Sequence, residues 1–392
     1  MKLEHLEIID KYPKDAIDFQ RKVLERSDIG NETYLPDGLH QLPMDNSLNS
    51  SVAEAERVLF SVVQDLFSKH MVNPRSIDII ITNCTLLCPT PSLASMIIKK
   101  FGLRSNVMSY SLSSMGCSAS ILSISLAKEL LKVHKNCLAL VLSMESICSN
   151  VYHGKFKSML LANCLFRMGG TAILLSNRTQ DKHKAKYELQ HIVRTHLGSR
   201  DSCYNSVVQE DDNEGYKGIN LSRSILHSAG ESLKVNMSSL GLLVLPYSQQ
   251  ILYGLSFLSI NLWPAEKKKG VYIPNFRKAF QHFCIHAGGK SVIEGIKENL
   301  KLSSRDVEAS KMTLYRFGNT SSSSIWYCLS YLEAKGRLKK GDRVWQLAFG
   351  SGFKCNSAVW KCISKLKPVD YSNAWSDRIH EYPVEVPEII DH

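Results

Sequence analysis

Ser114-Met115-Gly116-Cys117-Ser118-Ala119 joins an expected strand at 107–112 to an expected helix at 119–134. The apolar residues of that helix fall on more than one face, which indicates that it is largely buried. Gly116 permits a tight turn between the two elements. This turn places Cys117 at the amino end of the helix, where unpaired N–H groups and the helix dipole favour the thiolate over the thiol. The segment therefore offers a nucleophile, although a cysteine in such a place is most often only a core residue.

Strands and helices alternate on both sides of this segment. The β-branched run at 77–82 is typical of a strand buried on both faces. The other elements we expect are strands at 137–143, 171–176, 187–195, 282–286, 343–349 and 356–363, and helices at 89–101, 290–300 and 321–335. Alternation in both halves predicts α/β layers with mixed sheets.

Two stretches depart from this alternation. The polar stretch 198–218 is rich in Asp, Asn and Ser, which predicts a loop or lid. The apolar stretch 240–263 is interrupted by Pro246 and several polar residues, so it is a poor candidate for a transmembrane helix. We expect a buried strand there, followed by a helix packed on the core or docked on the surface, with a membrane-facing amphipathic surface as the alternative.

Composition narrows the possible partners and the cellular compartment. The formal net charge of +11 suits anionic partners such as CoA phosphates or an anionic membrane surface. Because no arginine-rich or aromatic-interleaved basic tract is present, we expect no nucleic-acid partner. The 11 cysteines include no CxxC pair and no zinc spacing, which indicates reduced intracellular thiols and no metal site. Residues 1–14 have no apolar stretch, so we expect neither a signal peptide nor a spanning helix there.

Two further segments add an imidazole and a carboxamide. His286 ends a strand in Cys284-Ile285-His286-Ala287-Gly288-Gly289, where the glycines let the backbone turn sharply. Asn319 precedes an apolar helix in Phe317-Gly318-Asn319-Thr320-Ser321. Taken alone, the first is consistent with a core histidine and the second with a helix cap. Together with Cys117 they form the minimum set for holding a thioester on sulfur and stabilising a carbanion beside it, chemistry that joins acyl thioesters through a new carbon–carbon bond.

The three segments occur in the chain order of thiolase-fold condensing enzymes, and the surrounding sequence closely resembles plant 3-ketoacyl-CoA synthases. The resemblance extends from about Phe19 to about Lys365 and includes the stretches 83–93, 163–170, 340–346 and 349–357. It implies a thiolase-like α/β fold of two similar halves in αβαβα layers, with the site between them. Residues 1–185 would form the half that carries Cys117, and residues 186–392 the half that carries His286 and Asn319. The resemblance also implies a homodimer.

The resemblance implies a role for each candidate residue. Cys117 would take the acyl group from acyl-CoA, and His286 and Asn319 would donate hydrogen bonds to the thioester oxygen of malonyl-CoA as CO₂ leaves. A turn of Gly350, Ser351 and Gly352 would direct backbone N–H groups toward the acyl carbonyl. Two histidines are further supporting candidates: His196 matches a family histidine, and His282 shares a strand face with His286.

The family also implies where such an enzyme works and what accompanies it. Its members act at the cytosolic face of the endoplasmic reticulum beside the reductases and dehydratase of the elongase complex. They need no cofactor or metal, because CoA is part of both substrates. The family typically begins with two membrane-spanning helices, which we do not find in this sequence. We therefore expect membrane contact without a spanning helix, or a cytosolic protein.

Three positions depart from the family pattern. Tyr315 stands where histidine is common, and Ser114 and Ser120 stand where glycine is common. Ser114 adds bulk to the turn that holds Cys117, and Tyr315 removes a titratable imidazole. Two alternatives stay open beside a 3-ketoacyl-CoA synthase of very-long-chain fatty acid elongation. The changes at Tyr315 and Ser114 and the missing membrane helices motivate a weakened or silent paralogue that binds and modulates active elongase subunits. A chalcone- or stilbene-type polyketide synthase is the alternative within the same fold.

Overall fold

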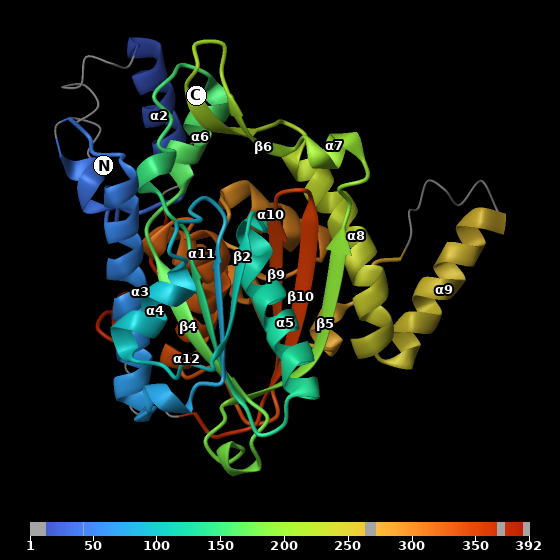
Figure 1. Ribbon diagram of the computed structural model, residues 1–392. Coiled ribbons are helices and arrows are strands. Elements are labelled where there is room, and N and C mark those ends of the chain that lie inside the picture. The colour runs from blue at the N-terminus through green and yellow to red at the C-terminus, as the bar shows by residue number, and fades with distance from the viewer. Residues whose placement is uncertain (1–12, 42, 263–271, 367–372, 387–392) are drawn as a thin grey trace.

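Two four-stranded sheets form the centre of the protein. The computed structural model describes residues 13–41, 43–262, 272–366 and 373–386 (Figure 1). The first sheet has the order β2-β1-β3-β4, in which β1 is parallel to β2 and β3, and β3 is antiparallel to β4. Its strands are β1 (Ile79–Cys84), β2 (Met108–Ser113), β3 (Leu138–Met144) and β4 (Gly170–Ser176). Every residue of β1 and β3 is buried, as the β-branched run at 77–82 predicted for β1.

The second sheet is built from later parts of the chain. Its order is β5-β10-β9-β8, with β8 parallel to β9 and the other two pairs antiparallel. Its strands are β5 (Tyr187–His196), β8 (His282–Ile285), β9 (Arg343–Gly350) and β10 (Lys354–Cys362). The boundary that we predict between residues 185 and 186 falls in the connection from β4 to β5.

Helices lie between the two sheets and on their outer faces. In the middle layer, α5 (Ala119–Val133) contacts β1, β3 and β10, and α12 (Ser324–Ala334) contacts β8 and β9. On the first sheet's outer face lie α3 (Leu48–His70) and α4 (Leu93–Phe101). On the second sheet's outer face lie α8 (Ile225–Val244) and α10 (Lys290–Asn299). The remaining helices include α2 (Lys14–Glu25), α6 (Lys157–Leu165) and α11 (Ser304–Phe317). The αβαβα order therefore follows from the packing.

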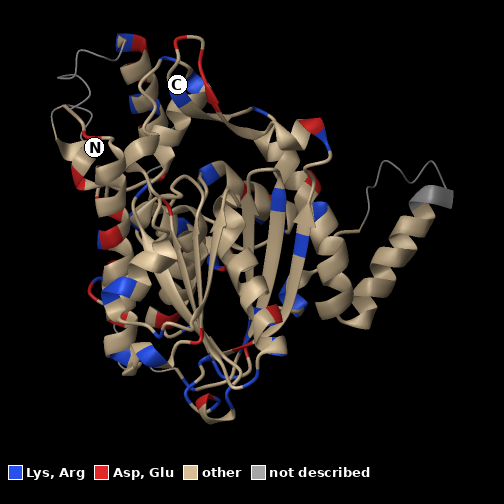
Figure 2. Ribbon diagram, in the orientation of Figure 1, with Lys and Arg blue, Asp and Glu red and all other residues tan. Residues whose placement is uncertain are grey.

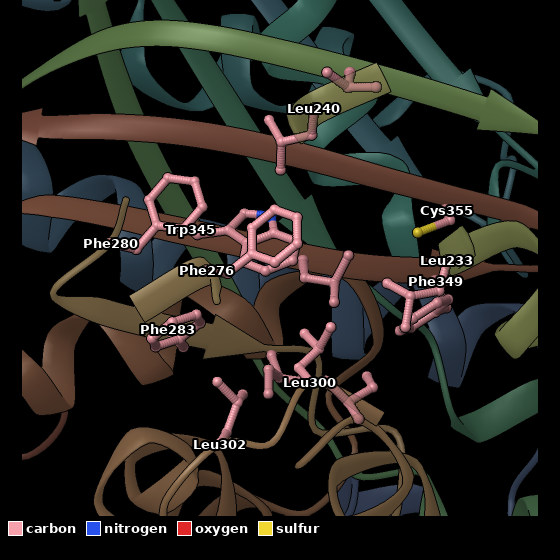
Figure 3. Packing of buried hydrophobic residues seen from close by; sticks show 14 of the residues in the cluster. Leu233, Leu240, Phe276, Phe280, Phe283, Leu300, Leu302, Trp345, Phe349 and Cys355 are labelled. Carbon is pink, nitrogen blue, oxygen red and sulfur yellow. The ribbon is translucent and has the colours of Figure 1, made fainter. Parts of the chain in front are cut away.

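An aromatic cluster and one buried amide attach α8 to the second sheet. Trp345 of β9 is 1% exposed, and its ring centroid lies 5.2 Å from that of Phe276 (Figure 3). Its indole N–H donates to Ser357 Oγ at 2.9 Å, and this hydroxyl donates to Asn236 Oδ1 at 2.6 Å. Asn236 Nδ2 in turn lies 2.8 Å from the carbonyl oxygen of Cys355 and 3.2 Å from that of Val193. One α8 side chain thus bridges β5 and β10.

The prediction of a loop or lid at 198–218 is wrong in part. The stretch contains α7 (Asp201–Tyr204) and the hairpin of β6 (Val207–Asp211) with β7 (Lys217–Leu221). Asp212 accepts hydrogen bonds from the backbone N–H groups of Glu214 and Tyr216, which closes the turn between the strands. The acidic residues of this hairpin hide its short alternating pattern, in which Ile219 is buried.

The prediction of a strand within 240–263 is wrong. Two helices meet there, α8 and α9 (Tyr247–Leu262), and the turn between them contains Pro246. Buried Leu233, Leu240 and Val244 recur at helical spacing along α8, and Pro246 disfavours a helical conformation at the residue before it. None of the described helices is long and apolar enough to cross a membrane. Most of the amino-terminal segment 1–14, for which we expected no signal peptide, lies outside the described residues.

The Asn236 bridge can be tested by its effect on stability. Asn236→Ala leaves two buried backbone carbonyls without this donor, so we expect the free energy of unfolding to fall by about 3 kcal/mol. Ser238→Ala, on the exposed face of the same helix, is the matched control and should change it by less than about 0.5 kcal/mol. Urea unfolding followed by circular dichroism measures both, and equal midpoints for the two variants would contradict the bridge.

Candidate active site

The turn that carries Cys117 is held by two left-handed residues. The short helix η3 (Gly116–Ser118) connects the end of β2 to α5, as the sequence predicts. Ser114 has φ of 57° and Gly116 has φ of 69°. A Cβ atom on Gly116 would lie 2.4 Å from the backbone nitrogen of Ser351, so no larger residue fits. Ser114 bears the cost of this conformation, about 1 kcal/mol for a residue with a Cβ.

The turn of residues 350–352, between β9 and β10, lies against this Cys117 turn. A Cβ atom on Gly350 would lie 2.7 Å from Ser118 Oγ and 2.9 Å from the carbonyl oxygen of Met115. Asn356 of β10 donates a hydrogen bond to the same Ser118 hydroxyl at 2.9 Å. Gly350, Ser351 and Gly352 are therefore brought beside the nucleophile's turn, on the side of the second sheet.

His286 continues the line of β8 and is 4% exposed. Its Nδ1 lies 2.6 Å from Ser324 Oγ, at the start of α12. A Cβ atom on Gly288 would lie 2.9 Å from the Nε2 atom, so this glycine lets the backbone pass close over the ring. Burial lowers the pKa of His286 to about 4, which keeps the imidazole neutral near pH 7.

Asn319 follows α11 through Gly318, whose φ of 68° turns the chain. Its Nδ2 donates to the carbonyl oxygen of Gly288 at 3.2 Å, and its Oδ1 accepts from the N–H of Ser321 at 2.9 Å. Since Gly288 also touches the ring of His286, the amide and the imidazole border the same backbone turn. Asn319 is 4% exposed.

Ser321 connects this pair to the thiol. Its hydroxyl forms a hydrogen bond with Cys117 and donates to Glu145 Oε2 at 2.9 Å. The structure therefore brings Cys117, His286 and Asn319 together around the segment 319–324. The expectation of a thiolate in the free protein is wrong, because burial together with the nearby Glu145 charge raises the pKa of Cys117 to about 12, against the lowering effect of Ser321.

Three polar residues of this cluster escaped the sequence analysis: Glu145, Ser321 and Ser324. Glu145 directly follows β3, and one of its carboxylate oxygens accepts from the backbone N–H groups of Thr85 and Leu86 at 3.0 and 2.9 Å. Burial raises the pKa of this carboxyl. Glu145 could have been found from the sequence, because it is a lone acidic residue at the end of an apolar strand. Ser321 and Ser324 were interpreted as part of a helix cap.

Among the described residues, neither supporting histidine has a recorded contact with Cys117, His286 or Asn319. His196, at the end of β5, is exposed and accepts a hydrogen bond from the N–H of Gly198. Its ring borders the Gly352 turn, so it lies at the rim beside the second sheet. His282 lies at the opposite end of β8 from His286, where its Nε2 pairs with Asp342 Oδ2 at 2.9 Å. Asp342 directly precedes β9, at the end of the sheet opposite to His286. The structure therefore does not bring His282 to Cys117.

The three departures have different surroundings. Ser114 occupies the left-handed position described above, and Ser120 is buried in α5 with a hydroxyl that has no hydrogen-bond partner among the described residues. The Tyr315 ring packs against Gly30, and its carbonyl accepts the Gly30 N–H at 2.8 Å. Tyr315 therefore faces the amino-terminal part of the chain, and the structure records no contact between it and Cys117, His286 or Asn319.

A shallow apolar pocket, open to solvent, adjoins the cluster. Its lining includes Leu86 and Ser146, which flank the Glu145 contacts, and Phe166, which forms a β-bridge with Asn319. The other lining residues are Asn150, Ala162 and Asn163 together with five aliphatic side chains from the amino-terminal segment, the 147–151 region and β7: Leu35, Leu39, Ile147, Val151 and Ile219. Such a lining suits a hydrocarbon chain.

Comparison with known proteins identifies close relatives. Residues 1–262 match the family model described as FAE1/type III polyketide synthase-like protein, and residues 277–362 match 3-oxoacyl-[acyl-carrier-protein] synthase III C terminal. The chain is 57% identical to 3-ketoacyl-CoA synthase 7 of Arabidopsis thaliana over 97% of its own length and 82% of the relative's. It is 53% identical to 3-ketoacyl-CoA synthase 5 of the same plant, covering 99% of this chain and 78% of that one.

Solved structures show the same architecture at lower sequence identity. CsyB complexed with CoA-SH superposes with a TM-score of 0.68 at 19% identity, covering 92% of this chain and 94% of that chain. The type III polyketide synthase domain of Steely1 from Dictyostelium gives a TM-score of 0.69 at 18% identity, covering 91% and 92%. The expected thiolase-like fold is thereby confirmed.

The neutral state of His286 predicts a pH dependence of stability. In the unfolded chain the imidazole takes up a proton below its ordinary pKa of 6.5, whereas in the folded protein it does so only near 4. Stability from this group is therefore lost as the pH falls from about 6.5 to about 4, by up to about 3 kcal/mol. Urea unfolding at several pH values should show a shallower slope for His286→Gln than for the parent protein and the exposed control His183→Gln, and parallel curves would contradict the prediction.

Proposed function

The chain belongs to the 3-ketoacyl-CoA synthase family, and from this membership we propose that Cys117, His286 and Asn319 together carry out its condensation reaction. It is an acyltransferase that condenses malonyl-CoA with an acyl group in very-long-chain fatty acid elongation. The observation that carries the assignment of residues is their convergence on one buried segment, 319–324, from three distant parts of the sequence.

The first step transfers the acyl group to sulfur. The Cys117 sulfur attacks the thioester carbon of acyl-CoA, and the bond to the CoA sulfur breaks. The thiol proton passes through the Ser321 hydroxyl to Glu145, whose raised pKa suits a proton acceptor, and then to the departing CoA thiolate. The closeness of the 350–352 turn to the Cys117 turn supports a role for its backbone N–H groups in stabilising the oxyanion.

The second step makes the carbon–carbon bond. Malonyl-CoA loses CO₂, and the electron pair moves onto the thioester oxygen as an enolate. Nε2–H of His286 and the second N–H of Asn319 Nδ2 donate to that oxygen, since Ser324 pairs with the Nδ1 atom of His286 and the Gly288 carbonyl accepts the first N–H of the amide. A Ser324 hydroxyl that donates to Nδ1 leaves the imidazole proton on Nε2, as this role requires. The enolate carbon then attacks the thioester carbon on Cys117, the bond to the Cys117 sulfur breaks, and 3-ketoacyl-CoA is released. The Cys117 thiolate takes up a proton from solvent through Glu145 and Ser321, which restores the thiol.

Assembly, cofactors and location extend the proposal. β2 forms an edge of the first sheet, and such an edge can pair with a second copy, which supports a homodimer. The steps above use only residues of this chain and the two CoA substrates, so no cofactor is required. By family membership the enzyme works at the cytosolic face of the endoplasmic reticulum with the elongase reductases and dehydratase.

The assigned nucleophile is tested by Cys117→Ala. We expect formation of 3-ketoacyl-CoA from long-chain acyl-CoA and malonyl-CoA to fall by about 10³-fold or more, because no other group can hold the acyl intermediate. Cys137→Ala changes a partly exposed cysteine directly before β3; it is the control and should retain activity. Product formation by the alanine variant at the parental rate would refute the mechanism. An inactive parent protein would favour a silent subunit, and products from aromatic starters would favour a polyketide synthase.

The apolar pocket predicts how chain length is limited. Leu86→Trp replaces a partly buried aliphatic side chain of the lining by a larger indole ring, which shortens the space for the acyl chain. We therefore expect the preferred acyl-CoA to become shorter while turnover of short acyl-CoA persists. Competition among acyl-CoA substrates of different lengths, read by mass spectrometry of the products, measures the shift. An unchanged product profile would place the acyl chain elsewhere.

A further inference from the structure

The α8–α9 hairpin presents an apolar surface that no described part of the chain covers. Figure 1 shows α9 projecting from the layered body. Eight large apolar side chains of the hairpin are between 46% and 83% exposed: Leu242, Leu243, Tyr247, Ile251, Leu252, Leu255, Phe257 and Leu258. We call these eight residues the hairpin patch. Exposed apolar surface of this extent marks an interaction site in a soluble domain.

The patch is held in place by defined contacts. The inner face of α8 packs on the second sheet through Leu240 and Val244. Gln250 Nε2 donates to the carbonyl oxygen of Leu245 at 2.8 Å, which ties α9 to the end of α8. Gln249 is 2% exposed, and its Oε1 accepts from the Tyr272 hydroxyl and the Asn275 N–H, both at 2.9 Å. The hairpin is therefore built to display these side chains.

The charge pattern along the sequence identifies the kind of partner. Residues 235–264 contain no Asp, Glu, Lys, Arg or His, and the described part of α9 carries neither blue nor red in Figure 2. A protein interface normally surrounds its apolar centre with a rim that includes charged residues, and residues 235–264 supply none. A bilayer requires no charged rim. It requires that backbone N–H and C=O groups be paired within the protein, as they are along the helix α9.

The residues that flank α9 in sequence fit the same partner. Tyr247 begins the helix, and Trp263 directly follows its last residue. Tyr and Trp are enriched at the membrane–water interface, where their rings lie at the level of the headgroups. Lys267-Lys268-Lys269 come next in the sequence, outside the described residues, and a lysine cluster is attracted to anionic lipid.

We propose that the hairpin patch inserts into the interfacial layer of a phospholipid bilayer containing anionic lipid. The 16 residues of α9 span about 24 Å, less than the roughly 30 Å of a hydrocarbon core, so the helix lies in one leaflet and does not cross. This inference deepens the membrane location proposed above, and it does not depend on the condensation chemistry.

Vesicle sedimentation of the full-length chain tests the proposal. The parent protein should sediment with vesicles of equal parts phosphatidylcholine and phosphatidylserine. The double variant Leu255→Glu/Leu258→Glu should lower the bound fraction by about tenfold or more. The matched control Met71→Glu/Val133→Glu makes the same charge change at residues that are 92% and 75% exposed elsewhere, and it should bind like the parent. The triple variant Lys267→Ala/Lys268→Ala/Lys269→Ala should bind phosphatidylserine vesicles no better than phosphatidylcholine vesicles.

Several results would overturn the proposal. One is that the parent protein stays in solution with both kinds of vesicle. Another is that the control pair loses binding as fully as the hairpin pair. If the hairpin pair turned a dimer into a monomer in size-exclusion chromatography while the parent ignored vesicles, the partner would be a second copy. Circular dichroism checks the fold, and Leu255→Ser/Leu258→Ser replaces the glutamate pair under the same criterion if the latter unfolds. Unchanged turnover of dissolved acyl-CoA by the hairpin pair separates this test from the chemistry.

Discussion

The hydrogen bonds of one buried segment, 318–324, hold together groups from distant parts of the chain. Its residues are almost completely inaccessible, so every polar atom there needs a partner inside the protein. Several of those partners are the candidate reaction groups or their neighbours: Gly288 for Asn319, Glu145 and Cys117 for Ser321, and His286 for Ser324. The position of each group therefore depends on the others, and the αβαβα layers serve to bring their strands and helices to this point.

Burial also determines the protonation states of these groups in the free protein. The imidazole of His286 is neutral and the thiol of Cys117 is protonated in the free protein, in each case because a charge would be poorly solvated there. A neutral imidazole can still donate from Nε2 to an enolate oxygen. The nucleophile in turn needs a proton acceptor, and Ser321 with Glu145 supplies one within hydrogen-bonding distance. These protonation states are the ones from which the proposed steps begin.

Much of the fold and the surroundings of the three principal candidate residues were predictable from the sequence, because they rest on strong local patterns. The buried run at 77–82, the glycine before Cys117 and the glycines after His286 each require a particular backbone environment. Glu145, Ser321 and Ser324 were missed because their importance comes from long-range contacts that no local pattern encodes. The hairpin at 207–221 and the pair α8–α9 were mispredicted because acidic residues hid one pattern and continuous apolar residues obscured the helical period of the other.

The central claim is that Cys117 alone holds the acyl intermediate in a site shared with His286 and Asn319. Peptide mass mapping after incubation with a long-chain acyl-CoA tests it most directly. The account predicts one acyl adduct per chain, on the peptide that contains Cys117, and predicts that His286→Gln and Asn319→Asp still form this adduct but accumulate it when malonyl-CoA is added. An adduct on any other of the 11 cysteines, or none at all, would contradict it.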